Sequence, residues 1–198
     1  MAGNGNQESN PSHNLRISAE RLWDNLMLTG TIGGTPKGGL CRLTLTETDR
    51  EARDWLAKAA AVLGCDTSVD DMGVMYARRG GQRNDVPPIA IGSHLDSQPT
   101  GGKFDGALGV LAALEVIHAL HAANYETFAP IELVNWTNEE GSRFAPALTA
   151  SGVFAGVFEH DWAHAREDRV GIRFGEGKRL LQMQAGFMVV DAAVQFAQ

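Results

Sequence analysis

Residues 89–106, IAIGSHLDSQPTGGKFDG, constrain the fold of this chain more than any other stretch. They begin with a short apolar run and continue into a glycine-rich loop that carries His94, Asp96 and Asp105. A short apolar run bounded by turn residues is typical of a buried strand. In open α/β sheets, ligands bind where parallel strands end. The pattern therefore predicts a buried strand that leads into a metal-binding loop.

A second apolar run, at residues 131–136, predicts another buried strand, and it leads directly into Glu139 and Glu140. Between the two runs, residues 106–122 carry apolar side chains around most of the circumference of a helix, which indicates a buried helix. Strand, helix and strand form a βαβ unit. If the two strands are parallel, their acidic ends lie side by side at one edge of the sheet.

Two amphipathic helices and a strand are predicted before this unit. Ser18 is placed to cap the first helix, and Thr46 to cap the second. Asp49 stands where the acidic partner of a capping box belongs, and Gly64 is a natural end for the second helix. Residues 73–79 read as a strand. This alternation predicts an α/β fold, a sheet with helices on both faces.

Composition limits the classes of partner. A chain of 198 residues, 43% of them apolar, can bury a single core. The net charge of -7 disfavours nucleic acid and anionic membranes, which select clustered Lys and Arg, and favours a small-molecule substrate. Cys41 and Cys65 are too few for a disulfide framework, and we find no segment that resembles a signal peptide or membrane span. We therefore expect a cytoplasmic protein whose residues 1–14, which lack apolar periodicity, form a disordered leader.

One imidazole with several carboxylates suits a divalent ion such as zinc, manganese or cobalt. No cysteine lies near these residues in the sequence, which argues against a structural zinc site. In an extended loop, Glu139 and Glu140 point in opposite directions, so one can bind metal while the other handles the proton of a water molecule.

Several of these residues also have a plain structural interpretation. Asp105 precedes a helix, where an aspartate is more often an N-cap than a ligand. Asp96 can shape a turn or orient the His94 imidazole, and a Glu-Glu pair is usually a solvated loop. Gln98 and Arg143 lie near the predicted site, where each can contact substrate or stabilise a loop.

The remaining histidines are weaker candidates for metal ligands. His118 and His121 fall on nearly the opposite side of their helix from Asp105 and far along it, so they cannot share a metal with it. His160 and His164 have the spacing of a helical metal pair, but an aspartate follows the first where a zincin has glutamate. We expect no metal role for them.

Two motifs resemble the metal-dependent amidases of the hydantoinase/carbamoylase family, in the M20 metallopeptidase clan. They are GSHLDSQPTGGKFDGALGV at residues 92–110 and NEEGSRF at residues 138–144. The family includes N-carbamoyl-L-amino-acid hydrolases, beta-ureidopropionases and allantoate amidohydrolases. The similarity extends to SGVFAG at 151–156 and FGE at 174–176, so it covers about residues 15–176. An M20 aminopeptidase is a less favoured hypothesis, because the long first motif matches the amidases better.

Carried over by position, the resemblance implies a site with two metal ions, zinc, manganese or cobalt. It makes His94 a ligand of one ion, Asp105 the carboxylate that bridges both, and Glu140 a ligand of the second. It also makes Glu139 the general base and Asp96 the carboxylate that steers His94. The implied reaction is hydrolysis of a carbamoyl or ureido group, a linear non-peptide carbon-nitrogen amide, by a metal-activated water.

The resemblance is to the N-terminal part of an M20-type catalytic domain only. A second ligand motif, HIEQG, and a separate dimerisation domain, which makes family members homodimers, have no counterpart here, and residues 177–198 form a divergent tail. Two ions normally need about five or six protein ligands, and we identify three. We therefore expect weak metal binding and slow or no turnover from this chain alone. The alternative is an inactive, truncated fragment that acts at most as a binding or dimerising module.

Overall fold

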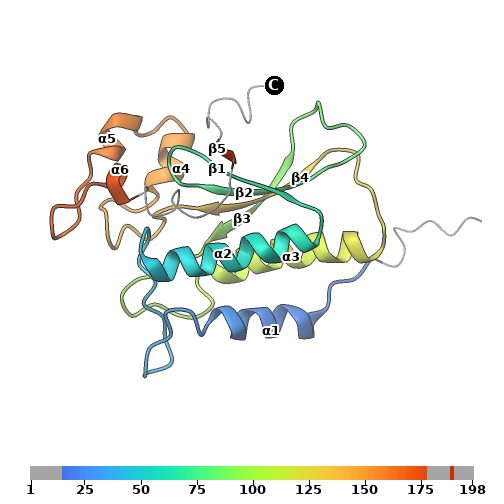
Figure 1. Ribbon diagram of the computed structural model, residues 1–198, viewed down its shortest axis with the longest axis horizontal. Coiled ribbons are helices and arrows are strands. Elements are labelled where there is room, and N and C mark those ends of the chain that lie inside the picture. The colour runs from blue at the N-terminus through green and yellow to red at the C-terminus, as the bar shows by residue number, and fades with distance from the viewer. Residues whose placement is uncertain (1–14, 178–187, 190–198) are drawn as a thin grey trace, which may run out of the picture.

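The computed structural model describes residues 15–177 and 188–189, arranged around a five-stranded sheet of order β3-β4-β2-β1-β5 (Figure 1). The helices are α1 (Ala19–Thr29), α2 (Glu47–Val62), α3 (Ala107–Ala122), α4 (Thr149–Phe154), α5 (His160–His164) and α6 (Phe174–Gly177). The strands are β1 (Asp66–Val69), β2 (Met75–Arg79), β3 (Ile89–His94), β4 (Ile131–Trp136) and β5 (Met188–Val189). The predicted leader and nearly all of the predicted tail lie outside the described residues.

The βαβ unit predicted from the sequence is confirmed. Strands β3 and β4 pair in parallel, from Ile89 opposite Ile131 to His94 opposite Trp136, and α3 connects them. The rest of the sheet is mixed, because β2 runs antiparallel to both β4 and β1. We did not predict β1, because its four residues, DTSV, show no apolar alternation.

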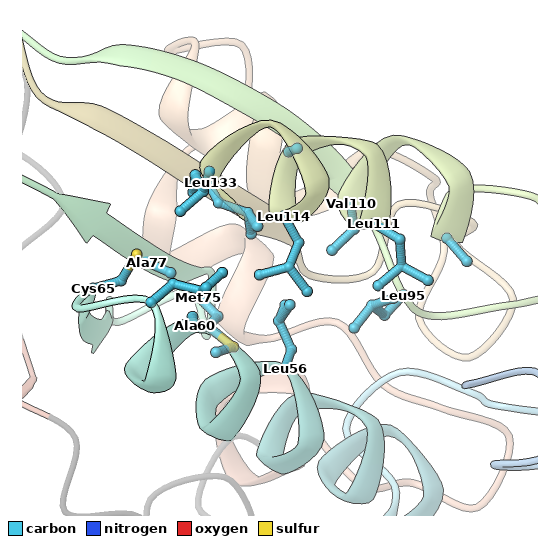
Figure 2. Packing of buried hydrophobic residues seen from close by; sticks show 14 of the residues in the cluster. Leu56, Ala60, Cys65, Met75, Ala77, Leu95, Val110, Leu111, Leu114 and Leu133 are labelled. Carbon is cyan, nitrogen blue, oxygen red and sulfur yellow. The ribbon is translucent and has the colours of Figure 1, made fainter. Parts of the chain in front are cut away.

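Helices cover both faces of the sheet, as predicted. In Figure 1, α2 and α3 lie on one face with α1 outside them, and α4, α5 and α6 lie on the other. Alternate strand residues feed two cores, because successive side chains point to opposite faces. Met75 and Leu133 pack in the larger core, against α2 and α3 (Figure 2), whereas Tyr76 and Val134 pack in the smaller one. Among the described residues, no helix is long and apolar enough to cross a membrane.

The predicted helix caps are present, with one correction. The hydroxyl groups of Ser18 and Thr46 each accept a hydrogen bond from the backbone of their own helix, and Gly64 follows α2 with φ of 76°. Asp49 does not complete the expected capping box. Its Oδ2 accepts from the N–H of Leu45, whose φ of 55° bends the chain just before the cap, and its Oδ1 binds Arg53 at 2.9 Å.

A buried carboxylate organises the turn between β1 and β2. Asp70 is 2% exposed, and its Oδ1 accepts hydrogen bonds from the N–H groups of Met72 and Val74 at 2.9 and 2.8 Å. Its Oδ2 accepts from the Tyr76 hydroxyl at 3.0 Å. Burial raises the pKa of Asp70 to about 6, although these hydrogen bonds oppose the change.

Replacing Asp70 by asparagine is expected to change how stability depends on pH. The pKa of Asp70 is higher in the folded chain than its ordinary value of about 4. The wild-type protein therefore loses stability as the pH rises from about 4 through 6, and a difference of this size is worth about 3 kcal/mol. Asparagine keeps the shape of the side chain without the charge.

Urea unfolding at pH values between 4 and 7 measures the effect. As the pH rises, the free energy of unfolding of the variant should increase by about 3 kcal/mol relative to that of wild type. The control is Asp66→Asn at the exposed first position of β1, and parallel pH curves for wild type and Asp70→Asn would contradict the prediction.

Candidate metal centre

The parallel strands bring one histidine and two glutamates together. His94 is the last residue of β3, and Glu139 and Glu140 follow the end of β4. Ligand atoms of these three residues all lie within 4.8 Å of one another. His94 is buried and the two glutamates are half-buried, so the group lies at the edge of the sheet with partial access to solvent. Of the three metal ligands implied by the resemblance, the structure thus gathers His94 and Glu140.

The His94 ring is held so that one nitrogen faces the acids. Its Nδ1 lies 3.0 Å from the main-chain oxygen of Asp96, and its Nε2 lies 3.2 Å from Oε2 of Glu139. The ring also packs against the backbone of Gly106, where an added Cβ would lie 2.4 Å from the imidazole. A hydrogen bond from Nδ1 to a carbonyl leaves Nε2 available as a metal ligand.

Asp96 contacts both the His94 ring and the two glutamates, but it does so through different groups. Its carboxylate accepts hydrogen bonds from the N–H groups of Glu139 and Glu140, each at 3.3 Å, and lies 3.8 Å from Nδ1 of His94. The nearer contact to the imidazole comes from its carbonyl. Burial, followed by the charge of nearby Asp49, raises the pKa of Asp96 to about 6. The carboxylate therefore positions the acidic pair, and the main chain orients the ring.

Glu140 has one carboxylate oxygen that is satisfied and one that is not. Oε2 accepts a hydrogen bond from the Gln98 amide at 3.0 Å. Oε1 is buried and has no hydrogen-bond partner among the described residues. An unpaired buried acceptor is costly, and a divalent cation would satisfy it. The residues present therefore fit a metal ion.

Asp105 is not a member of this group. It is exposed, in the turn before α3, and is not one of the residues whose ligand atoms converge with those of His94. The N-cap interpretation is wrong, because the N-cap of α3 is Gly106, with φ of 63° and no side-chain hydrogen bond. Gly106 occupies this position because only a residue without Cβ fits against the His94 ring.

Asn138, to which the sequence analysis gave no role, shapes the loop that presents the two glutamates. It has φ of 56°, and its side-chain amide donates to the Phe144 carbonyl at 2.6 Å and the Thr149 hydroxyl at 2.7 Å. The Leu148 N–H donates to the Glu139 carbonyl at 2.7 Å, which closes the loop. A polar residue two positions after the end of a buried strand was the available sign in the sequence.

Arg143, which the sequence analysis placed near the predicted site, has structural contacts of its own. Arg143 donates to a carboxylate oxygen of Asp168 at 3.1 Å and to the carbonyl groups of Thr44 and Leu45, so it joins loops.

The histidine pair of α5, His160 and His164, contacts Asp71, which is not part of the candidate site. Nε2 of His160 lies 2.7 Å from Oδ2 of Asp71, and Nε2 of His164 lies 3.0 Å from the main-chain oxygen of Asp71. These contacts tie α5 to the turn that precedes β2.

Comparison with known proteins identifies relatives that match most of the chain. The model of peptidase family M20/M25/M40 matches residues 90–192. An N-carbamoyl-L-amino-acid amidohydrolase of Rhizobium meliloti is 49% identical over 166 residues, which cover 84% of this chain and 40% of the relative. An allantoate amidohydrolase of Bacillus subtilis is 34% identical over 140 residues, which cover 71% of this chain and 34% of the relative.

Solved structures give the same result. A hydantoinase/carbamoylase family amidase from Burkholderia ambifaria matches with a TM-score of 0.84 and 46% identity, over 87% of this chain and 43% of that chain. The chain spans about 40% of the length of the first curated relatives it matches. The resemblance carried by the two sequence motifs is thus confirmed, and the chain belongs to peptidase family M20/M25/M40, in its hydantoinase/carbamoylase group of amidases.

Proposed function

We propose that His94 and Glu140 serve as ligands for divalent metal ions, that Glu139 beside them is the general base, and that the chain serves hydrolysis of a carbamoyl or ureido amide. The observation that carries the proposal is the convergence of one imidazole and two carboxylates within 4.8 Å at the ends of two parallel strands. The unpaired Oε1 of Glu140 supports it. The names of the relatives, N-carbamoyl-L-amino-acid amidohydrolase and allantoate amidohydrolase, support the substrate class.

The donor set favours zinc, manganese or cobalt, because one imidazole and carboxylates suit ions of intermediate hardness. Such an ion, when bound, lowers the pKa of water and polarises a carbonyl oxygen. We assign Asp105 as the carboxylate that would bridge this ion and a second one. Its neighbour Gly106 touches the His94 ring, which supports this assignment.

The protein's own residues divide the remaining work. Glu139 is partly open to solvent, with 31% of its side chain exposed, so it can accept the proton of the attacking water. As the bond between the carbonyl carbon and the departing nitrogen breaks, Glu139 returns that proton to the nitrogen. Asp96 keeps both glutamates in place through their N–H groups, and Gln98 orients Glu140.

The test is metal-dependent release of ammonia from an N-carbamoyl amino acid by the purified chain. EDTA should stop any turnover, and zinc, manganese or cobalt should restore it. Glu139→Gln is expected to lower the rate by about a hundredfold, because it removes the general base, and to change the metal Kd far less. Glu126→Gln, at an exposed position between α3 and β4, is the matched control.

The outcomes separate the competing functions. Metal binding that depends on His94, without ammonia release under any metal, would favour the binding-module alternative. Faster cleavage of a dipeptide than of the N-carbamoyl compound would favour an aminopeptidase. A chain that binds no divalent metal would overturn the proposed function.

A further inference from the structure

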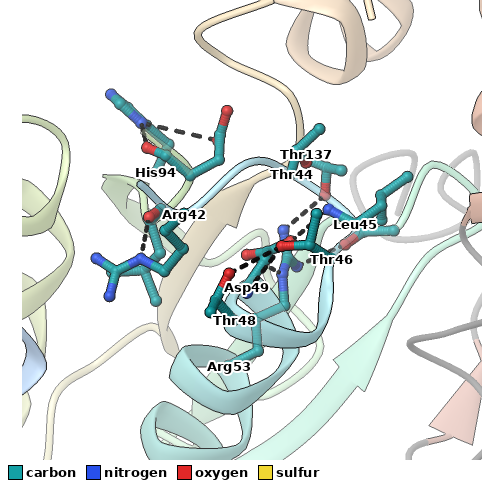
Figure 3. Close-up of polar contacts among 12 residues, drawn as sticks. Arg42, Thr44, Leu45, Thr46, Thr48, Asp49, Arg53, His94 and Thr137 are labelled. Atoms are coloured by element: carbon teal, nitrogen blue, oxygen red, sulfur yellow. Dashed lines mark hydrogen bonds and ion pairs between the residues drawn. The ribbon is translucent and has the colours of Figure 1, made fainter. Parts of the chain in front are cut away.

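A buried arginine lies beneath the loop that follows His94 (Figure 3). Arg42 is 1% exposed, and within the described residues every hydrogen bond of its guanidinium goes to a main-chain oxygen. Its Nε binds the carbonyl of Leu95 at 2.7 Å, and one terminal nitrogen binds those of Thr29 and Ile32 at 3.1 and 3.2 Å. The side chain thus ties this loop to the end of α1.

The backbone of Arg42 holds the same loop from a second direction. Its N–H donates to the Ser97 hydroxyl at 2.9 Å, and its carbonyl accepts from the Ser97 N–H at 2.8 Å. Residues 95–97 are therefore fixed at both ends by Arg42. Between those ends lies Asp96, whose carbonyl contacts Nδ1 of His94.

A second buried arginine allows a comparison. Arg53 binds Asp49 at 2.9 Å and donates to the Thr137 hydroxyl at 3.2 Å, below the strand end that leads to Glu139 (Figure 3). Arg53 thus has an ion-pair partner. In the described part of the chain, no carboxylate lies within ion-pair distance of Arg42.

Keeping a guanidinium buried on carbonyl groups alone is expensive. Arginine is suited to the position because its planar fork reaches several fixed acceptors at once, which a single ammonium group cannot do. The buried guanidinium lies at the loop of residues 95–97, which contacts both His94 and the two glutamates. This placement indicates that Arg42 maintains the shape of that loop.

We propose that Arg42 is a positioning residue of the metal centre. By fixing residues 95–97, it holds the Asp96 carbonyl on Nδ1 of His94 and the Asp96 carboxylate on the N–H groups of the two glutamates. The ligand atoms then face one another before any metal arrives. The inference rests on the proposed function, because it assigns Arg42 to the same site.

The test compares Arg42→Lys and Arg42→Met with Arg79→Met. Arg79 also donates to a main-chain oxygen, that of Tyr125 at 2.7 Å, but at the opposite end of the sheet. Zinc titration by calorimetry gives the Kd, corrected for the folded fraction from urea unfolding. Long-range proton–nitrogen NMR on the metal-free chain, at alkaline pH, reports which nitrogen of His94 carries the proton.

We expect the zinc Kd of Arg42→Met to rise about 10- to 100-fold, the usual loss when a group that orients a ligand is removed. In that variant the His94 proton should be shared between Nδ1 and Nε2, whereas in wild type and Arg79→Met it stays on Nδ1. Arg42→Lys should fall between them, because lysine keeps the charge but not all three contacts.

A folded Arg42→Met variant with wild-type zinc affinity and the proton still on Nδ1 would overturn the inference. If the methionine variant does not fold, the lysine variant decides by the same two measurements. Wild-type protein that fails to bind zinc would refute the proposed function alone. The NMR comparison on metal-free protein would then still decide whether Arg42 positions His94.

Discussion

Replacing His94 by alanine is expected to weaken zinc binding by more than about a hundredfold. Groups that merely orient a ligand are worth about 10- to 100-fold in affinity, and His94 is a direct ligand in the proposed site. It supplies the one nitrogen in the group, and its loss leaves Glu139 and Glu140 as two neighbouring carboxylates. Carboxylates alone hold zinc less well than a set that includes imidazole.

Calorimetric titration and elemental analysis of dialysed protein would measure this loss. His121→Ala, at an exposed position in the last turn of α3, is the matched control and should behave as wild type. The metal content of Asp105→Ala, measured alongside, shows whether a second ion binds, because losing a bridging carboxylate should remove that ion. Equal metal content in wild type and His94→Ala would eliminate the site.

Replacing Gly92 by alanine is expected to destabilise the domain strongly. An added Cβ would lie 1.9 Å from the carbonyl oxygen of Val134 and 2.8 Å from its carbonyl carbon and nitrogen. These are backbone atoms of the paired strand, so relief requires β3 and β4 to separate where they deliver the ligands. We expect a loss of more than about 4 kcal/mol, which is exceptional for one substitution. Domains are stable by only about 5–15 kcal/mol in total.

Gly102→Ala is the matched control from the same motif. A Cβ at Gly102 meets nothing within 4 Å, and its φ is not in the left-handed region. Its stability should stay within about 1 kcal/mol of wild type. Urea unfolding followed by circular dichroism measures both variants. Similar midpoints for Gly92→Ala and Gly102→Ala would show that the two strands do not approach as described.

The βαβ unit could be predicted because its signals are local. Residues 89–91 and 131–136 are apolar runs bounded by turn residues, and the helix between them is apolar around its circumference. The parallel pairing then follows from the crossover connection, which places both strand ends at the same edge. His94 and Glu140, 46 positions apart in the chain (140 − 94), could for this reason be expected to meet.

The partners of polar side chains could not be predicted in the same way. Asp49 was expected to bind the start of its own helix, but it binds Arg53 and the N–H of Leu45, because the preceding turn brings that N–H to it. For Asp105 the alternative to a metal ligand was an N-cap, but the close approach of His94 puts Gly106 at that position. Arg42 carries no sequence sign of burial, since its acceptors come from α1 and from the loop after β3.

The sequence by itself determined the class of fold, the two strand ends that carry His94 and the glutamate pair, and the family. Apolar periodicity and motif spacing act over a few residues and survive without knowledge of distant neighbours. Only the tertiary structure decided which group touches which: that the Asp96 carbonyl holds the imidazole, that its carboxylate holds the glutamates, and that Arg42 supports both. Hydrogen bonds depend on distances of tenths of an ångström between segments remote in the chain, and those distances exist only once the sheet and helices have packed.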